Sequence, residues 1–319
     1  MGKRSAVVAH TKVDIAARSP AMPETRTFTE NELREFDVTN PDEGKEFNKR
    51  AEILLGETPA KRAQSLKEFR KKLEMIEDFE PKTDDDRFLL RFLRARKFDV
   101  DKAYKLMRNF YKVRLQNPQR YVPIGLGPRD FKHLYELNCA VLLRHRNPLD
   151  GTVIVLCRFG KWKPSTGFGP LDVYTPAVYG GELIMDQPEV QLNGFTFILD
   201  LQGLEYNWIL KYVTPDYITQ MLGFAQESYP LRIKKVHIIN QSYLWSIGYA
   251  IGRPFVPSKL RERYHLHGSN MSSLHQHIPR EILPEELGGL TGPLDYWFYD
   301  CIYKLHDRIV KESHYGYGV

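Results

Sequence analysis

The chain has 319 residues, of which 42% are hydrophobic and 27% are charged, the balance of an ordinary globular protein. Its longest uncharged apolar runs, such as Val153–Cys157 and Phe195–Leu199, are far shorter than the ~20 residues that a membrane-spanning helix needs, so we expect no such span. The 46 basic residues outnumber the 40 acidic ones, which favours anionic partners without separating nucleic acid from lipid head groups.

The cysteines and the N-terminus bear on the compartment. Cys139, Cys157 and Cys301 are widely separated and odd in number, which fits neither a disulfide framework nor a zinc knuckle. The basic N-terminus is not followed by the apolar run of about 7–15 residues that a secretory signal requires. We therefore expect a cytoplasmic protein.

The first part of the chain predicts a flexible leader and then helices. Residues 1–45 are turn-rich and contain Pro20, Pro23 and Pro41, which is typical of a poorly ordered segment. Residues 46–120 have apolar residues three and four positions apart and predict a small helical bundle. Its helices are expected at 60–76, at 88–96 after three acidic residues, and after Asp99, a suitable N-cap.

The middle of the chain predicts strands at 140–144, 152–158, 194–201 and 235–240, where Val, Ile, Leu and Phe gather. The turn sequence at 147–151 predicts that the first two strands form a hairpin. Long helical stretches separate the later strands, which indicates parallel βαβ units. The predicted fold class is therefore α/β, with a mostly parallel sheet within 121–292 and a C-terminal helix and tail over 293–319.

Catalytic signatures are absent from the sequence. It contains no GxxxxGK[ST] loop, no GxGxxG after a strand, no GxSxG elbow and no HExxH. Asp200 has the chemistry of a general base, but no nucleophile or acid accompanies it, so a structural role is the favoured interpretation. We predict no catalytic residues and a protein that is not an enzyme.

Two His-x-His pairs, at 265/267 and 275/277, are the candidate metal ligands. On a strand each pair would share a face, and three or four imidazoles suit zinc. No carboxylate or cysteine stands at ligand spacing with them. The favoured interpretation is that His265 and His267 end a strand and that His275 and His277 lie in a helical turn, so we predict no metal and no cofactor.

Cations gather at three places: 87–97, 232–235 and 253–263. Each cluster is also explained by a solvated face, but together they would form a surface for phosphates. Near an anionic bilayer each Lys or Arg contributes about 1 kcal/mol to binding, so four or five of them would give roughly 4–5 kcal/mol, enough for reversible attachment. A nucleic-acid binder would interleave exposed aromatic residues with the cations, whereas Phe88 and Phe92 have the pattern of core, so we predict no nucleic-acid partner.

The segment 243–256 is almost uncharged and apolar on all sides of a helix. It is either a buried core helix or a lid that covers an apolar cavity and meets lipid with its outer face. Aromatic residues beside cations are typical of an interfacial helix, and Gly248 and Gly252 suit a hinge, so the lid is favoured.

A series of short motifs runs through residues 50–290: Leu89–Asp99, Asn193-Gly194, Asp200–Gly203, Ser228–Arg232, Val236–Asn240, Pro254-Phe255, His265–Gly268 and Leu283–Gly289. In this order they resemble the CRAL-TRIO (Sec14-like) lipid-transfer family, and most closely its branch of tocopherol carriers, retinaldehyde carriers and clavesin. The resemblance implies a helical N-terminal bundle over 46–120 and a lipid-binding domain over 121–292, with an apolar pocket under a helical lid.

The resemblance also implies a function. It describes an intracellular carrier of one hydrophobic ligand, such as a tocopherol, retinoid or carotenoid, which meets membranes transiently at endosomes or the plasma membrane. The residues implied for phosphoinositide binding are Arg96, Arg232, Lys234, Lys259 and Arg263. Those implied for the pocket are Trp162, Tyr174, Ala177, Gly181, Phe195, Phe197, Leu199, Met221, Phe224, Tyr229, Ile233, Leu244, Trp245, Phe255 and Val256.

Two positions depart from the family pattern. Ala177 and Gly181 stand where the tocopherol carrier has two serines that anchor its ligand through water, which predicts a wider cavity for a larger or less polar ligand. A phosphoinositide-sensing adaptor and a lipid-modifying enzyme that uses Asp200 or the histidines are the alternatives. The pattern leaves open the ligand, the phosphoinositide, the organelle, the oligomeric state and the role of residues 1–45.

Overall fold

The computed structural model describes residues 27–33, 35–38, 45–163, 167–168, 172, 174–212, 214–243, 245, 249, 252–256 and 258–317. The predicted leader over 1–45 therefore lies mostly outside the described residues. The same holds for much of the predicted lid over 243–256, including Leu244 and one of the two hinge glycines, Gly248.

Four helices form the N-terminal bundle: α1 (Lys45–Leu55), α2 (Pro59–Leu73), α3 (Asp86–Ala95) and α4 (Val100–Gln116). The last three correspond to the helices predicted from the sequence, and α1 precedes them. Side-chain caps fix three of their starts. Thr58 accepts from the Lys61 amide, Asp85 from the Arg87 and Phe88 amides, and Asp99 from the Lys102 amide. The predicted cap at Asp99 is thus confirmed.

A five-stranded sheet follows, in the order β1 (Ala140–Leu142), β2 (Val153–Arg158), β3 (Phe195–Asp200), β4 (Ile233–Ile239) and β5 (Tyr264–Gly268). The first pair is antiparallel and the other three are parallel, which confirms the hairpin and the mostly parallel α/β sheet. β5 lies beyond the four strands predicted from apolar runs. Its histidines dilute the apolar signal, although His265 and His267 do lie on this strand as expected.

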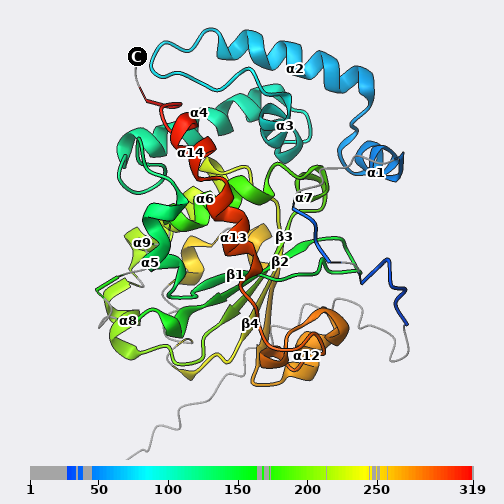
Figure 1. Ribbon diagram of the computed structural model, residues 1–319, viewed down its shortest axis with the longest axis vertical. Helices are drawn as coiled ribbons and strands as arrows, with labels where there is room; N and C mark the ends of the chain where they lie inside the picture. Colours follow the sequence, from blue (N-terminus) through cyan, green and yellow to red (C-terminus); the bar gives the residue numbers. More distant parts are fainter. Residues whose placement is uncertain are drawn as a thin grey trace, which may run out of the picture.

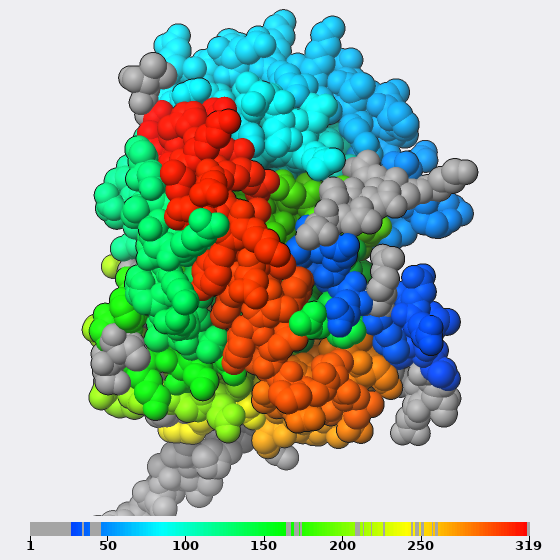
Figure 2. Space-filling model, viewed as in Figure 1, coloured from blue at the N-terminus to red at the C-terminus, as the bar shows by residue number. Residues whose placement is uncertain are grey.

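Helices surround the sheet and connect it to the bundle (Figure 1). The predicted C-terminal helix is present as two consecutive helices, α13 and α14, which run from the sheet toward the bundle across the surface shown in Figure 2. No helix among the described residues is both long enough and apolar enough to cross a bilayer. The helices are α5 (Lys132–Tyr135), α6 (Tyr174–Ile184), α7 (Pro188–Asn193), α8 (Tyr206–Tyr212), α9 (Pro215–Gly223), α11 (Ser258–Arg261), α12 (Met271–His275), α13 (Trp297–Lys304) and α14 (His306–Glu312).

The two faces of the sheet have different surroundings. Because side chains alternate along a strand, Ile154 and Ile198 point to one face and Val155 and Phe197 to the other. The first face packs on the segment that contains α12 and forms a closed core with Leu274, Ile278, Ile282, Leu283 and Leu287. The second face lies under α6 and α13 and encloses a cavity. We call these the closed face and the cavity face.

Candidate ligand-binding site

An apolar cavity of about 280 Å³ lies on the cavity face, between the sheet and helices α6, α9 and α13. Pockets of a few hundred Å³ with mainly apolar walls are the usual sites for small hydrophobic ligands. Nine of the predicted pocket residues line it: Trp162, Tyr174, Ala177, Gly181, Phe195, Phe197, Met221, Phe224 and Tyr229.

Five other predicted pocket residues lie outside this wall. Leu199, Ile233 and Trp245 pack around Val236 and Ile238 in a neighbouring apolar cluster, to which Phe159 and Phe197 also belong. Val256 packs on Leu222, and Phe255 is 42% exposed. Trp245 and Val256 belong to the connection between β4 and β5, and they pack on β4 and on Leu222 of α9 rather than on the cavity wall. The sixth, Leu244, lies outside the described residues.

Two parts of the wall were not predicted from the sequence. Strand alternation in the predicted hairpin would have selected Leu142, Val155 and Cys157, which line the cavity. Phe298 and Tyr299 of α13 also line it, but no local signal shows that the C-terminal helix folds back onto this face. The cavity wall is therefore assembled from segments far apart in the chain.

Gly181 does not widen the cavity as predicted. A Cβ at this position would overlap the Tyr229 hydroxyl, so the space that glycine leaves is occupied by the tyrosine ring. Tyr229 is 3% exposed and its hydroxyl donates to the Val178 carbonyl at 3.2 Å. Gly181 thus permits a close approach of α6 and the Tyr229 ring, which lies on the segment before β4, while Ala177 contributes a small side chain to the wall.

Several predicted phosphate-binding residues gather beside β4, near the cavity. Arg232 donates to the Gln191 and Leu192 carbonyls at 3.2 and 2.7 Å, and Arg263 donates to the Ile233 carbonyl. Lys234 stands where the pairing of β3 and β4 shifts register. Burial and then the charges of Arg232 and Arg263 lower the pKa of Lys234, so the three cations crowd one another. We call Arg232, Lys234 and Arg263 the basic cleft.

The other cations of the predicted phosphate-binding surface differ in their surroundings. Lys97, on the turn after α3, also lowers the pKa of Lys234 and so extends the cleft toward the bundle. Arg96 is partly buried, and burial lowers its pKa while Glu227 raises it. The side chain of Lys259, on α11, lies outside the described residues.

Two arginines of the first cluster are structural. Arg91 is 4% exposed and pairs with Glu182 at 2.6 Å and with Asp186. Arg94 is 1% exposed and pairs with Glu57 at 2.7 Å. Because carboxylates from other parts of the chain pair with both guanidiniums, Arg91 joins α3 to α6 and Arg94 joins α3 to the turn between α1 and α2, rather than binding phosphate.

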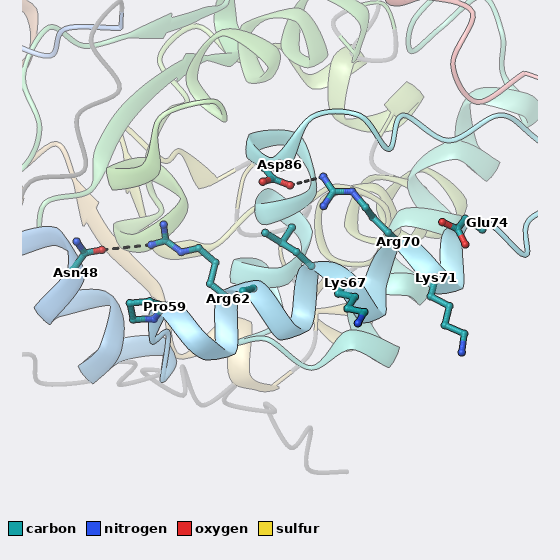
Figure 3. Close-up of a pocket in the computed structure, with 10 residues that line it drawn as sticks. Asn48, Pro59, Arg62, Lys67, Arg70, Lys71, Glu74 and Asp86 are labelled. Atoms are coloured by element: carbon teal, nitrogen blue, oxygen red, sulfur yellow. Dashed lines mark hydrogen bonds and ion pairs between the residues drawn. The ribbon is translucent and has the colours of Figure 1, made fainter.

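A larger hollow of about 940 Å³ lies on the bundle, along α2 (Figure 3). Charged and amide side chains stand along it: Arg70 pairs with Asp86, and Arg62 lies 3.5 Å from the Asn48 side chain. Lys67 is exposed at its edge. This open, charged groove is a poor match for a hydrophobic ligand.

The closed face contains a group of histidines under α12. His237 is fully buried, and its Nδ1 lies 2.9 Å from Nε2 of His267. The rings of His265 and His277 lie 4.9 and 5.2 Å from that of His237. Burial, followed by neighbouring histidines, lowers the pKa of His265 and of His267 to about 4.

The positions of these histidines in the strand and helix are those favoured in the sequence analysis over a metal-ligand role. His265 and His267 lie on β5, and His275 ends α12 and bonds to the Leu287 carbonyl at 2.8 Å. Within the described ranges, no three His, Cys, Asp or Glu side chains are arranged to hold a metal ion. Asp200 is likewise engaged, because its Oδ1 accepts from Asn240 Nδ2 at 2.8 Å and from the Gln202 amide at 3.0 Å.

The chain matches two domains of a known protein family. The CRAL/TRIO domain matches residues 140–289, and the CRAL/TRIO N-terminal domain matches residues 65–109. The protein belongs to the CRAL/TRIO family.

Individual relatives are similar over most of this chain. Human alpha-tocopherol transfer protein-like is 35% identical over 230 residues, covering 72% of this chain and 66% of that protein. Human clavesin-2 is 31% identical over 246 residues, covering 77% and 74%. The matches span slightly less than two thirds of the alpha-tocopherol transfer protein-like relatives. A crystal structure of Sfh5 aligns with a TM-score of 0.47 at 15% identity, over 83% of this chain and 98% of that one.

Proposed function

We propose that this protein carries one hydrophobic ligand in the apolar cavity and exchanges it at membranes that contain phosphoinositides. The observation that carries the proposal is the aromatic cavity on one face of the sheet, with a crowded basic cleft beside it. A ligand with many methylene groups gains about 0.8 kcal/mol for each one removed from water. Because a bilayer offers a similar gain, exchange between membrane and cavity is nearly balanced, and the protein supplies a path that avoids water.

The membrane half of the proposal rests on the charges of the basic cleft. Arg232 and Lys234 are partly buried and repel one another and Arg263, so an anion there relieves an existing repulsion. Guanidinium groups bind phosphate through paired donors and ammonium groups act as point charges, which suits a multiply phosphorylated head group. Arg96 and Lys259 are proposed as further members, and the cytoplasmic faces of endosomes or the plasma membrane as the places of contact.

The same proposal assigns the parts of the chain. Residues 46–120 form the bundle, 121–292 the ligand-binding domain with 243–256 as its lid, and 293–319 the C-terminal helix and tail. No catalytic step is proposed, because the Asp200 carboxylate is engaged by Asn240 and the Gln202 amide. The proposed ligand class is tocopherol, retinoid, carotenoid or a similar lipid, and the name of one relative, alpha-tocopherol transfer protein-like, favours the first of these.

A vesicle-transfer assay tests this function. Donor vesicles carry a fluorescent tocopherol or retinoid, and acceptor vesicles are made with or without a phosphatidylinositol bisphosphate. We expect the full chain to accelerate transfer, and more so with the phosphoinositide. Lys234→Glu should reduce that gain by about tenfold or more, because reversing one charge changes attraction by about 2 kcal/mol.

The matched control is Lys235→Glu. Lys235 neighbours Lys234 on β4, but its ammonium pairs with Asp150 at 3.0 Å. This variant should lose that pair and keep phosphoinositide-stimulated transfer. No acceleration by the wild-type chain, or equal losses in the two variants, would contradict the proposal.

A further inference from the structure

Two polar groups in the cavity wall have no hydrogen-bond partner among the residues that the structure describes. Tyr174 is 6% exposed and Trp162 is 9% exposed. The hydroxyl of the first and the indole Nε1 of the second are enclosed, yet within the described ranges no hydrogen-bond partner reaches either atom. Buried polar groups are nearly always satisfied in folded proteins, so each such exception indicates a missing partner.

Neighbouring phenols show that the fold can satisfy such groups. Tyr135 and Tyr299 line the same cavity and donate to the Pro176 and Ala140 carbonyls at 3.3 and 3.2 Å. Tyr179, on α6 with Tyr174, donates to the Leu126 carbonyl at 3.1 Å. The lack of a partner at Tyr174 is therefore specific to that position, and not a general property of tyrosines in this part of the chain.

The surroundings define what chemistry is missing. The Tyr174 ring packs on Tyr121 and Phe224 at 5.5 and 5.0 Å, and burial raises the pKa of its hydroxyl, which keeps the proton available for donation. Trp162 packs edge-on against Phe159 at 5.6 Å, and an indole nitrogen can only donate. Both groups thus require a hydrogen-bond acceptor, in a wall that is otherwise almost entirely apolar.

We infer that the cavity selects an oxygenated lipid, whose carbonyl or hydroxyl oxygen accepts a hydrogen bond from Tyr174 or Trp162, over a hydrocarbon of the same shape. The inference rests on the proposed carrier function and names its ligand class more closely. It also revises the expectation of a less polar ligand drawn from Ala177 and Gly181. The cavity still has hydrogen-bond donors for a polar ligand, and Tyr174 and Trp162 supply them.

Matched lipid pairs test the inference. The full chain is incubated with equimolar mixtures of phytol and phytane, retinol and its deoxy hydrocarbon, and a diketo carotenoid and β-carotene. The lipids retained after gel filtration are then extracted and quantified by mass spectrometry. We expect the wild type to prefer the oxygenated member of at least one pair by about tenfold, the usual contribution of one buried hydrogen bond.

Three variants assign that preference. Tyr174→Phe and Trp162→Phe preserve ring packing and remove one donor each, and at least one of them should lower the preference to near unity while still retaining lipid. Tyr179→Phe removes a hydroxyl that already has a backbone partner outside the cavity wall, and it should keep the wild-type preference. Thermal unfolding confirms that each variant is folded.

The outcomes separate the two proposals. Retention of lipid with no preference for oxygen, or a preference that both donor variants keep, overturns the inference and leaves the carrier function standing. Retention of neither member of any pair by the folded wild-type protein overturns the carrier function, and the inference with it.

Discussion

The two faces of the sheet are built from the same strands, yet one is filled and the other is hollow. On β3, Ile198 is completely buried in the closed face, whereas its neighbour Phe197 lines the cavity. Both faces are apolar, so hydrophobicity alone does not decide which one encloses space. The difference lies in the covering elements: the segment around α12 inserts leucine and isoleucine side chains between the strands' side chains, whereas α6 presents the small side chain of Ala177.

The largest predicted effect is a difference in the stability lost when a side chain on each face is replaced by alanine. Ile198→Ala should lower the free energy of unfolding by about 3 kcal/mol, because it opens a void in a close-packed core. Phe197→Ala should cost less than half of that amount, since its ring already borders empty space. Urea unfolding measures both values, and equal losses would show that the cavity face is packed as tightly as the closed face.

The cavity face also has one position where no space remains. Gly181→Ala should lower the unfolding free energy by about 1–2 kcal/mol, because the added methyl group overlaps the Tyr229 hydroxyl and disturbs its bond to Val178. Gly180 lies next to it, where a Cβ would meet its nearest neighbour, Ile302, at an ordinary 3.7 Å, so Gly180→Ala serves as the control. Similar thermal unfolding of the two variants would refute the role given to Gly181.

A smaller effect should distinguish the closed face by its response to acid. Folding lowers the pKa of His265 and His267 to about 4, below the ~6.5 of an unfolded histidine, so the unfolded chain binds more protons. Their contribution to stability is complete above about pH 6.5 and is lost as the pH falls toward 4. Between these two pH values, His265→Gln should reduce the number of protons taken up on unfolding by about one.

The dependence of urea unfolding on pH gives that uptake directly. His145→Gln is the comparison, because His145 lies outside the histidine group and bonds to the Leu33 carbonyl at 2.7 Å. An uptake that His265→Gln leaves unchanged would mean that the buried group does not control the acid response.

The parts predicted correctly from sequence depend on local patterns. Periodicity and caps such as Asp99 define the bundle, and apolar runs define β1 to β4, because those signals come from residues close together in the chain. Long-range contacts were not predictable. Nothing near Arg91 shows that Glu182 and Asp186 neutralise it, and nothing near Gly181 shows that Tyr229 fills its space.

The difference between local patterns and long-range contacts also explains which residues of the candidate site could be predicted. Nine of the residues that the resemblance implies for the pocket line the cavity, whereas Leu199, Ile233 and Trp245 pack in the adjoining cluster. The unpartnered atoms of Trp162 and Tyr174 are visible only in three dimensions, because the absence of an acceptor is a property of the whole surroundings.

Native mass spectrometry of the intact protein, after exposure to a total lipid extract, tests the central claim most directly. The account predicts a single lipid bound per chain to the wild type, and at least tenfold less in Ala177→Phe, whose ring would occupy the cavity. Ala63→Phe, which places the same ring in the polar groove of the bundle, should bind lipid as the wild type does. A folded wild-type chain without bound lipid, or an Ala177→Phe variant that binds it undiminished, would contradict the account.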